Sequence, residues 1–244
     1  MRTNSQGDST LIIMPTYNEL ENAHLILAEI LSRIPKVNIL VIDDNSPDGT
    51  LQSLLEDFEG DSRCKFMSRE RKLGLGSAYR LGFEFALKNN YKFVVTMDAD
   101  GSHSIIDLVN ILGVDGKEAL VIGSRYVNGG GIENWNISRR FISTFGNYFA
   151  RRMLCIQIRD CTSGFKRISV QQLAKIDFSS SNLDGYGFQI EITRAFLDKN
   201  FSVCETPIYL LDRKFGKSKM SWGIAFEAFM QVCKWKYQRN LSIK

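Results

Sequence analysis

The first half of the sequence alternates short apolar runs with longer amphipathic segments, and this alternation constrains the fold more than any other feature. The apolar runs occupy residues 11–14, 39–42, 93–97 and 120–122, and apolar side chains at helical spacing occupy residues 20–34 and 77–88. Such an alternation is typical of a parallel sheet covered by helices. We therefore predict a βαβα unit over residues 11–125, with the carboxyl ends of its strands at one ligand-binding crevice.

The chain is long and apolar enough to bury a large core, with 244 residues of which 44% are apolar. It shows no repeat and no linker, so we predict a single domain over residues 11–244 after a flexible N-terminus at residues 1–10. The net charge of +4 does not favour a nucleic-acid partner. No signal peptide or run of about 20 apolar residues is found, so we expect a soluble or peripheral intracellular protein with reduced thiols.

Polar segments follow three of the predicted strands, at residues 15–19 (PTYNE), 43–50 (DDNSPDGT) and 98–103 (DADGSH). Asp98 and Asp100 can turn toward one divalent cation such as Mg²⁺ or Mn²⁺, which in turn binds a diphosphate. The alternative is a solvated turn in which Asp100 caps the next helix. Asp43 and Asp44 likewise fit either a turn or the carboxylate that binds a ribose or base.

Several other segments allow a phosphate-binding or a purely structural interpretation. The loop KLGLGSAYRLG at residues 72–82 opens a helix and can present backbone N–H groups to an anion. His103 is either a hydrogen-bonding residue beside the aspartates or an incidental turn residue. Basic side chains that either bind phosphate or form solvated charge are Arg125, Arg139, Arg213, Lys214, Lys217 and Lys219.

The sequence changes character after Arg125. The segment YVNGGGIENWNISRR at residues 126–140 is rich in glycine and predicts a mobile loop. A helix follows with an aromatic stripe of Phe141, Phe145, Phe149 and Met153, and with arginines at both ends. This stripe fits either an interfacial helix at a membrane or a helix that faces the core.

Nine blocks together resemble the dolichyl/polyprenyl-phosphate mannosyltransferases, which are inverting family 2 glycosyltransferases. They are PTYNE (15–19), VIDDNSPDGT (41–50), GLGSAYRLGF (74–83), MDADGSH (97–103), GSRYVNGGGIENW (123–135), SRR (138–140), RDCTSGFK (159–166), GYGFQIEI (185–192) and GKSKM (216–220). The resemblance covers nearly the whole chain. It implies a GT-A fold, which is a Rossmann-like nucleotide-sugar-binding sheet flanked by helices, with C-terminal interfacial helices, a nucleotide-binding half at residues 11–125 and an acceptor half at residues 126–244.

The resemblance also implies roles for individual residues. Asp98 and Asp100 correspond to the metal pair, and Asp100, Arg125 and Arg139 to the catalytic residues. The donor-binding positions are Pro15, Tyr17, Glu19, Asp44, Asp98, Asp100, Arg213 and Lys219, and the acceptor-phosphate positions are Arg125, Arg139 and Ser143. Further implied site positions are Asp43, Gln189, Glu191 and Ser102, the last of which replaces a glutamine that some relatives use as a third metal contact.

The implied reaction moves mannose from GDP-mannose to a dolichyl or polyprenyl monophosphate with inversion and with Mg²⁺ or Mn²⁺. The alternative within this family is UDP-glucose, UDP-N-acetylglucosamine or a non-lipid acceptor. The implied partners are a membrane surface and small membrane-anchoring subunits. The implied location is peripheral, at the cytoplasmic face of the endoplasmic reticulum in a eukaryote or of the plasma membrane in a prokaryote.

Overall fold

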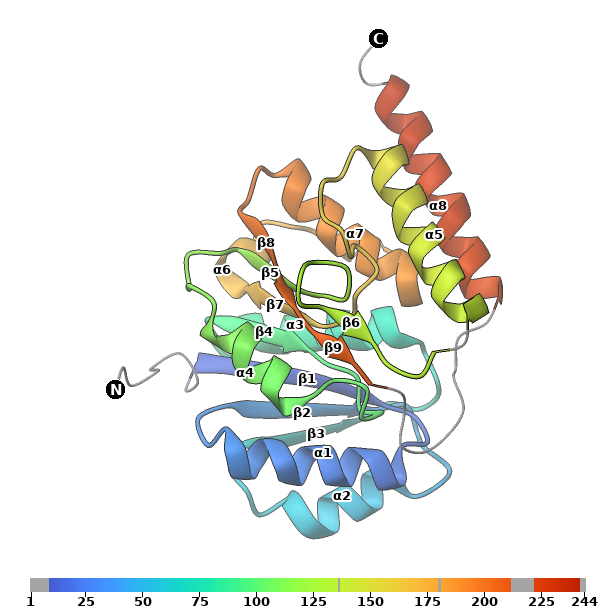
Figure 1. The fold of residues 1–244 in the computed structure, drawn as a ribbon. Helices are drawn as coiled ribbons and strands as arrows, with labels where there is room; N and C mark the ends of the chain where they lie inside the picture. The colour runs from blue at the N-terminus through green and yellow to red at the C-terminus, as the bar shows by residue number, and fades with distance from the viewer. Residues whose placement is uncertain (1–8, 136, 180, 212–221, 242–244) are drawn as a thin grey trace.

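A seven-stranded sheet flanked by helices forms the centre of the computed structural model, which describes residues 9–135, 137–179, 181–211 and 222–241 (Figure 1). The strand order is β3-β2-β1-β4-β7-β5-β8. The strands are β1 (Thr10–Thr16), β2 (Asn38–Asp43), β3 (Cys64–Ser68), β4 (Phe93–Thr96), β5 (Leu120–Ser124), β7 (Lys166–Ser169) and β8 (Val203–Pro207).

One strand of this sheet runs against all the others. The pairs β1–β2, β2–β3, β1–β4 and β5–β8 are parallel, whereas β7 is antiparallel to both of its neighbours, with Lys166 opposite Thr96 and Ile122. The four predicted strands β1, β2, β4 and β5 therefore run in the predicted parallel direction, but the prediction misses the antiparallel β7 between β4 and β5. As a result, the first residue of β7 lies at the edge where the parallel strands end.

The sheet is buried on both faces because successive residues of a strand point to opposite sides. Leu11 and Ile13 of β1 belong to one core cluster, and Ile12 and Met14 belong to the other. The second cluster contains residues of α1 (Leu20–Arg33), α2 (Thr50–Phe58) and α4 (Ile105–Gly113); the first contains residues of α3 (Leu75–Lys88), α6 (Val170–Leu173) and α7 (Gly185–Asp198).

Two long helices, α5 (Ile137–Leu154) and α8 (Trp222–Leu241), lie side by side and extend beyond the sheet (Figure 1). Ala150 and Leu154 of α5 and Val232 and Trp235 of α8 reach the first core cluster, so the pair is anchored at one side. Among the described residues, no helix has the length and apolar character needed to cross a bilayer.

The glycine-rich segment after Arg125 is tied to a second, two-stranded sheet. Its strand β6 (Gly131–Ile132) pairs in parallel with β9 (Tyr209–Leu210). The next residue, Leu211, donates its N–H to the carbonyl of Ser102 at 3.0 Å. Residues 208–211 thus connect this segment to the loop that carries the aspartate pair.

The strands predicted at residues 11–14, 39–42, 93–97 and 120–122 and the helices predicted at 20–34 and 77–88 are confirmed, each to within one or two residues. The sequence interpretation did not find α2, β3, α4, β7 or β8. β1 begins at Thr10, which is fully buried, one residue before the predicted start of the domain.

Candidate active site

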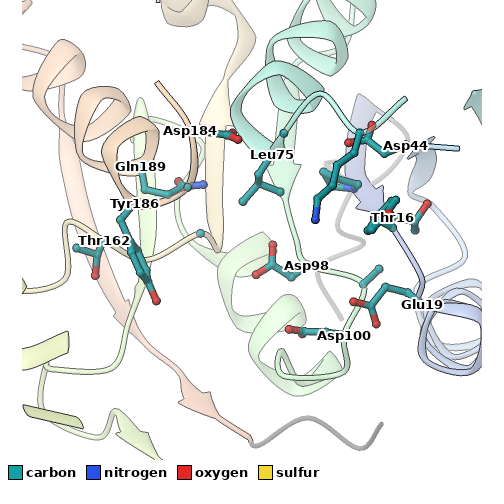
Figure 2. Close-up of a pocket in the computed structure, with 17 residues that line it drawn as sticks. Thr16, Glu19, Asp44, Leu75, Asp98, Asp100, Thr162, Asp184, Tyr186 and Gln189 are labelled. Carbon is teal, nitrogen blue, oxygen red and sulfur yellow. The ribbon is translucent and has the colours of Figure 1, made fainter. Parts of the chain in front are cut away.

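A polar cavity of about 280 Å³ opens at the edge where β1, β2 and β4 end. We call it the acidic cavity, because Asp44, Asp98, Asp100 and Glu19 line it (Figure 2). The other lining residues are Pro15, Thr16, Tyr17, Lys72, Gly74, Leu75, Ala99, Thr162, Gly164, Asp184, Gly185, Tyr186 and Gln189. The three polar segments that follow predicted strands therefore meet, as the sequence predicted.

The aspartate pair is held by a tight local network. Gly101 has a φ of +78°, a conformation that suits glycine, and it turns the chain directly after Asp100. Ser102 donates to Asp100 Oδ1 through its N–H at 3.0 Å and its hydroxyl at 2.6 Å. The Tyr79 hydroxyl donates to Asp98 at 3.2 Å. Both carboxylates thus have fixed orientations at the cavity wall.

The alternative role of Asp100 as a helix cap is wrong. Helix α4 begins at Ile105, and Ser104 is its N-cap, with Ser104 Oγ accepting from Asp107 N at 3.0 Å. Asp98 and Asp100 instead provide hard carboxylate oxygens of the kind that Mg²⁺ and Mn²⁺ prefer. The described residues contain no group of three His, Cys, Asp or Glu side chains placed to hold a metal, so water and substrate oxygens would complete the coordination of any cation bound here.

Asp43 and Asp44 have different surroundings although they are adjacent in sequence. Asp43 is buried beside the cavity wall, where it accepts from Thr16 Oγ1 at 2.7 Å and from Ser46 N at 2.8 Å. Asp44 lines the cavity, pairs with Arg69 and accepts from Leu73 N at 3.1 Å. Asp43 is thus a turn residue, as one alternative predicted, and Asp44 faces the ligand space.

His103 is buried behind the aspartate pair. Its ring stacks on Phe165 with centroids 4.4 Å apart, and its Nε2 lies 3.9 Å from Asp98 Oδ2. Burial lowers the pKa of His103 below its ordinary value, against the opposing effect of Asp98 and Asp100. The imidazole is therefore mainly neutral near pH 7. It lies beside the aspartates, but its 3.9 Å approach to Asp98 is longer than a hydrogen bond, so a hydrogen-bonding role for His103 stays a prediction.

A second, smaller cavity of about 100 Å³ adjoins the aspartates, and we call it the arginine cavity. Arg125 and Arg139 line it together with Asp98, Asp100, Ser102, His103, Trp135, Thr162, Ser163, Gly164, Tyr186, Ile208, Leu210 and Leu211. The guanidinium of Arg139 lies 3.8 Å from the centre of the Trp135 ring, within cation–π range. The structure thus places both predicted arginines around the same cavity as Asp98 and Asp100, the carboxylates predicted to bind a metal ion.

The charge of Arg125 is balanced by a buried carboxylate. Arg125 donates to Asp160 through Nε at 2.6 Å and Nη2 at 2.7 Å, and the two side chains are 5% and 0% exposed. Burial alone would raise the pKa of Asp160, but Arg125 holds it below its ordinary value. This bidentate pair forms part of the cavity wall. An acceptor phosphate bound by Arg125, as predicted, would compete with Asp160 for the guanidinium.

The turn that contains Asp160 is fixed from three sides. Arg125 lies at the end of β5, and Asn147 of α5 donates to Thr162 Oγ1 at 2.9 Å. The carboxylate of Glu205 on β8 accepts from Asp160 N at 2.9 Å and from Arg159 N at 2.8 Å. These contacts fix the position of Thr162, which lines both cavities.

An apolar groove of about 400 Å³ lies between α5, α7 and α8. It is lined by Phe141, Ile142, Ser143, Phe145, Gly146, Phe149, Ala150, Thr162, Tyr186, Ile190, Phe226, Ala228, Phe229 and Val232. Thr162 and Tyr186 also line the acidic cavity and the arginine cavity. The groove and the two polar cavities therefore meet at these two side chains.

One part of the aromatic stripe on α5 faces the core and the other part is exposed, so the stripe combines the two alternatives that the sequence allowed. Phe141 and Phe145 are 68% and 52% exposed, whereas Phe149 and Met153 pack against the core. The rings of Phe141, Phe145, Phe149 and Phe229 stack in succession, with centroid distances of 6.1, 6.4 and 4.5 Å. The stripe is thus anchored at its carboxyl end and exposed at its amino end.

The glycine loop before α3 already has a carboxylate partner for one of its N–H groups. Asp184 lies at the amino end of α7 and accepts a hydrogen bond from the N–H of Gly76. Lys72 lines the acidic cavity with its ammonium 4.3 Å from the centre of the Tyr17 ring. The loop therefore contributes Lys72, Gly74 and Leu75 to the cavity wall. The N–H of Gly76 is already hydrogen-bonded to the carboxylate of Asp184.

Gln189 and Glu191 face different surroundings, as expected for residues two apart on a helix. Gln189 lines the acidic cavity and accepts from the buried ammonium of Lys166 at 2.7 Å. Glu191 lines none of the three cavities and accepts from Ser181 Oγ at 2.5 Å. Gln189 therefore lies within the site, whereas the assignment of Glu191 stays a prediction that no contact with these cavities supports.

The remaining predicted residues are distributed as follows. Ser143 lies in the apolar groove and accepts from the Tyr126 hydroxyl at 2.8 Å. Arg213 and Lys219, predicted to bind the donor, lie outside the described residues. Site residues that received no role from the sequence are Tyr79, Trp135, Asp160, Thr162, Gly164, Lys166, Asp184 and Tyr186. Many of these lie in the blocks RDCTSGFK and GYGFQIEI, but only the fold shows which side chains face the cavities.

Comparison with known sequences gives a consistent result. A family model described as glycosyl transferase family 2 matches residues 11–176. Polyprenol monophosphomannose synthase of Mycolicibacterium smegmatis is 43% identical over 235 residues, which cover 95% of this chain and 88% of that protein. Undecaprenyl-phosphate mannosyltransferase of Micrococcus luteus is 39% identical over 225 residues, which cover 92% of this chain and 93% of that protein.

Solved structures with low sequence identity share the fold. Glucosyl-3-phosphoglycerate synthase from Mycobacterium tuberculosis, in complex with Mn²⁺, UDP and phosphoglyceric acid, has a TM-score of 0.68 at 16% identity, with 95% of this chain and 79% of that chain covered. Mannosyl-3-phosphoglycerate synthase from Rubrobacter xylanophilus has a TM-score of 0.65 at 19% identity, with 95% and 75% covered. The fold is the GT-A fold that the sequence predicted.

Removal of the carboxylate from the buried ion pair should cost far more stability than the same change on the surface. Asp160→Asn leaves Arg125 buried without its counter-charge, and we expect the free energy of unfolding to fall by about 3–5 kcal/mol. Asp61→Asn is the matched control, because Asp61 and Arg63 form a 2.6 Å pair in which each side chain is 28% exposed. Its loss should cost less than about 1 kcal/mol. Chemical denaturation of both variants checks this, and equal small effects would contradict the structural role of the pair.

Proposed function

This chain belongs to glycosyl transferase family 2, and on that premise we propose that it transfers mannose from GDP-mannose to a polyprenyl or dolichyl monophosphate with inversion. The new bond joins the anomeric carbon to an oxygen of the lipid phosphate. The bond that breaks joins the same carbon to the diphosphate, and GDP leaves with the electron pair. The mannosyltransferases from M. smegmatis and M. luteus support the sugar and the class of acceptor.

The observation that carries this proposal is the junction of the polar cavities with the apolar groove. Thr162 and Tyr186 line all three spaces. A lipid phosphate is itself divided between an anionic head and an apolar tail, so it matches this junction. The tail would occupy the groove between α5 and α8, and the head would enter the arginine cavity beside Asp98 and Asp100.

The proposed chemistry needs position and charge balance more than a strong base. A phosphate monoester is largely dianionic near neutral pH, because its second pKa is about 6, so its oxygen is already a nucleophile. Arg139 would hold that phosphate in line with the anomeric carbon. The Arg125–Asp160 pair fixes the wall behind it. Ser143, and Arg213 and Lys219 outside the described residues, stay predictions as phosphate contacts.

The donor would occupy the acidic cavity. Pro15, Tyr17, Glu19 and Asp44 line its end at β1 and β2, where the nucleoside would lie, and Lys72 adds a positive charge. Asp98 and Asp100 would hold Mg²⁺ or Mn²⁺, which balances the charge of the departing diphosphate when bound. The donor set of two carboxylates beside the Ser102 hydroxyl fits either ion.

The acceptor's tail implies a membrane, and the exposed face of α5 and α8 suits attachment to one. Its exposed apolar residues are Ile137, Phe141, Phe145, Tyr148, Phe226, Phe229, Met230 and Tyr237. Arg140 and Arg152 on α5 are exposed as well and would meet anionic head groups. The proposal therefore includes peripheral binding at the cytoplasmic face of a membrane.

A parallel transfer assay tests the donor and the acceptor. Radiolabelled GDP-mannose, UDP-glucose and UDP-N-acetylglucosamine are each offered with polyprenyl phosphate and Mn²⁺, and in separate reactions with 3-phosphoglycerate. We expect label to enter lipid from GDP-mannose alone. Label from a UDP-sugar instead would contradict the donor, and label on 3-phosphoglycerate without lipid labelling would contradict the acceptor.

Replacement of Asp98 or of Asp100 should abolish the dependence of transfer on metal. We expect Asp98→Asn and Asp100→Asn each to lower transfer by at least about 100-fold at saturating metal, because each loses a charged ligand. Asp43→Asn is the matched control, since Asp43 ends a neighbouring strand but is engaged by Thr16 and Ser46. A metal titration of transfer measures this. Wild-type metal dependence in Asp98→Asn and Asp100→Asn would argue against the metal role.

Loss of the exposed aromatics should release the protein from lipid. We expect the double variant Phe141→Ser/Phe145→Ser to bind vesicles of phosphatidylcholine and phosphatidylglycerol at least about 10-fold more weakly, because it lacks two exposed rings that would be buried in the bilayer. Ile106→Ser/Val109→Ser changes two exposed apolar residues of α4 and is the control. Cosedimentation measures binding. A wild type that does not bind vesicles would point to an anchoring subunit instead.

A further inference from the structure

A buried lysine lies directly behind the acidic cavity. Lys166 begins β7 and is 0% exposed. Its Nζ donates to the carbonyl oxygen of Ser163 and, at 2.7 Å, to Oε1 of Gln189 on α7. The antiparallel direction of β7 brings this lysine to the edge of the sheet where the cavity opens.

The lysine determines which way the Gln189 carboxamide faces. An ammonium group donates hydrogen bonds but accepts none, so it must meet the oxygen of the amide and not the nitrogen. Burial lowers the pKa of Lys166 to about 7, so the neutral amine is also present near neutral pH. That amine still has two hydrogens for its two acceptors. Because Oε1 is the atom that meets Nζ, the amide nitrogen of Gln189 faces away from Lys166.

The amide nitrogen of Gln189 is buried, since the residue is only 2% exposed, and it has no hydrogen-bond partner among the described residues. Buried donors are nearly always paired, so a partner from outside the chain is indicated. Gly164 shows where that partner fits. A Cβ atom at Gly164 would lie 3.6 Å from Gln189 Nε2 and 3.9 Å from each carboxylate oxygen of Asp98. The missing side chain leaves a space with a donor on one side and a carboxylate on the other.

We propose that this space receives a hydroxyl group of the transferred hexose, which accepts from Gln189 Nε2 and donates to Asp98, and that Lys166 is the positioning residue for the amide. A hydroxyl group satisfies both neighbours because it donates and accepts at once. A phosphate oxygen can accept from Gln189 Nε2 but cannot donate to Asp98, and its binding here is the alternative that the GDP measurement below tests. This inference rests on the proposed function, since it assigns one hydroxyl of the donor sugar to one pair of side chains.

The consequence is sugar selectivity. A site that pairs a substrate hydroxyl rejects the analogue that lacks it, because the buried polar groups then lose their partner. Among the 2-, 3-, 4- and 6-deoxy analogues of GDP-mannose, we expect one to be transferred at least about 10-fold less efficiently than the rest. That one identifies the hydroxyl group that the pair contacts.

Two variants at Gln189 and Lys166 test the assignment. Gln189→Glu keeps the size of the side chain and its contact with Lys166 but replaces the amide donor with an acceptor. Lys166→Met removes the group that orients the amide. We expect kcat/KM for GDP-mannose to fall roughly 10- to 100-fold in each variant, and the discrimination against the sensitive deoxy analogue to disappear. The single variant Gln189→Met and the double variant Lys166→Met/Gln189→Met complete a double-mutant cycle with Lys166→Met. The losses of the two single methionine variants should not add in the double, because Lys166 acts through Gln189.

Arg167→Met is the matched control. Arg167 is the next residue of β7, is 1% exposed and donates to the carbonyls of Leu112, Val114 and Asp115 on the other side of the sheet. It should lower thermal stability without changing the order of preference among the deoxy donors. If Lys166→Met does not fold, Gln189→Glu decides the hydroxyl contact and Lys166→Arg, which keeps a donor for Gln189 Oε1, replaces Lys166→Met and should retain the discrimination.

Measurement of GDP binding by calorimetry distinguishes a contact between Gln189 and a sugar hydroxyl from a contact between Gln189 and the diphosphate. Gln189→Glu should change GDP affinity by less than about 3-fold, because GDP lacks the hexose. Equal weakening of GDP and GDP-mannose would place the amide on the diphosphate and overturn the proposal, as would unchanged discrimination among the deoxy donors. Transfer by the wild type tests the proposed function separately. If the wild type uses another nucleotide sugar, the deoxy analogues of that sugar are compared in the same way.

Discussion

The buried ion pair between Arg125 and Asp160 is the interaction on which the rest of the site depends. It joins the end of β5 to the turn before β7, and Asn147 and Glu205 attach α5 and β8 to the same turn. Two charges without access to water require each other, because the loss of either leaves an uncompensated buried charge. The turn therefore has one stable position, and Thr162 is placed where the polar cavities and the apolar groove meet.

The site joins a charged region to an apolar region. The acidic side is built from carboxylates held by hydrogen bonds from Ser102 and Tyr79, and it suits charged ligands. The side between α5 and α8 is built from stacked aromatic rings, and it suits a hydrocarbon chain. Tyr186 belongs to both sides, since its ring has an apolar face and a polar hydroxyl group.

The sequence predicts the part of the site that depends on local order along the chain. The ends of β1, β2 and β4 could be located from apolar runs, and parallel strands bring their ends together, so the three segments that carry Glu19, Asp44, Asp98 and Asp100 could be expected at one edge. The reversal of β7 follows from long-range packing and gives no periodic signal. Lys166 therefore could not be assigned a role. Asp43 and Asp44 could not be told apart for a related reason, because neighbouring residues of a strand face opposite ways.

The strand order also has a consequence for how the chain reaches its fold during synthesis. β7 lies between β4 and β5 but is made after both, so β4 lacks a neighbour on one side until residue 169 has left the ribosome. Until then an apolar strand edge stays open to pairing with other chains, which is a hazard for aggregation. Strands β1–β4 can assemble early, whereas the cavities close only when the second half of the chain has been added.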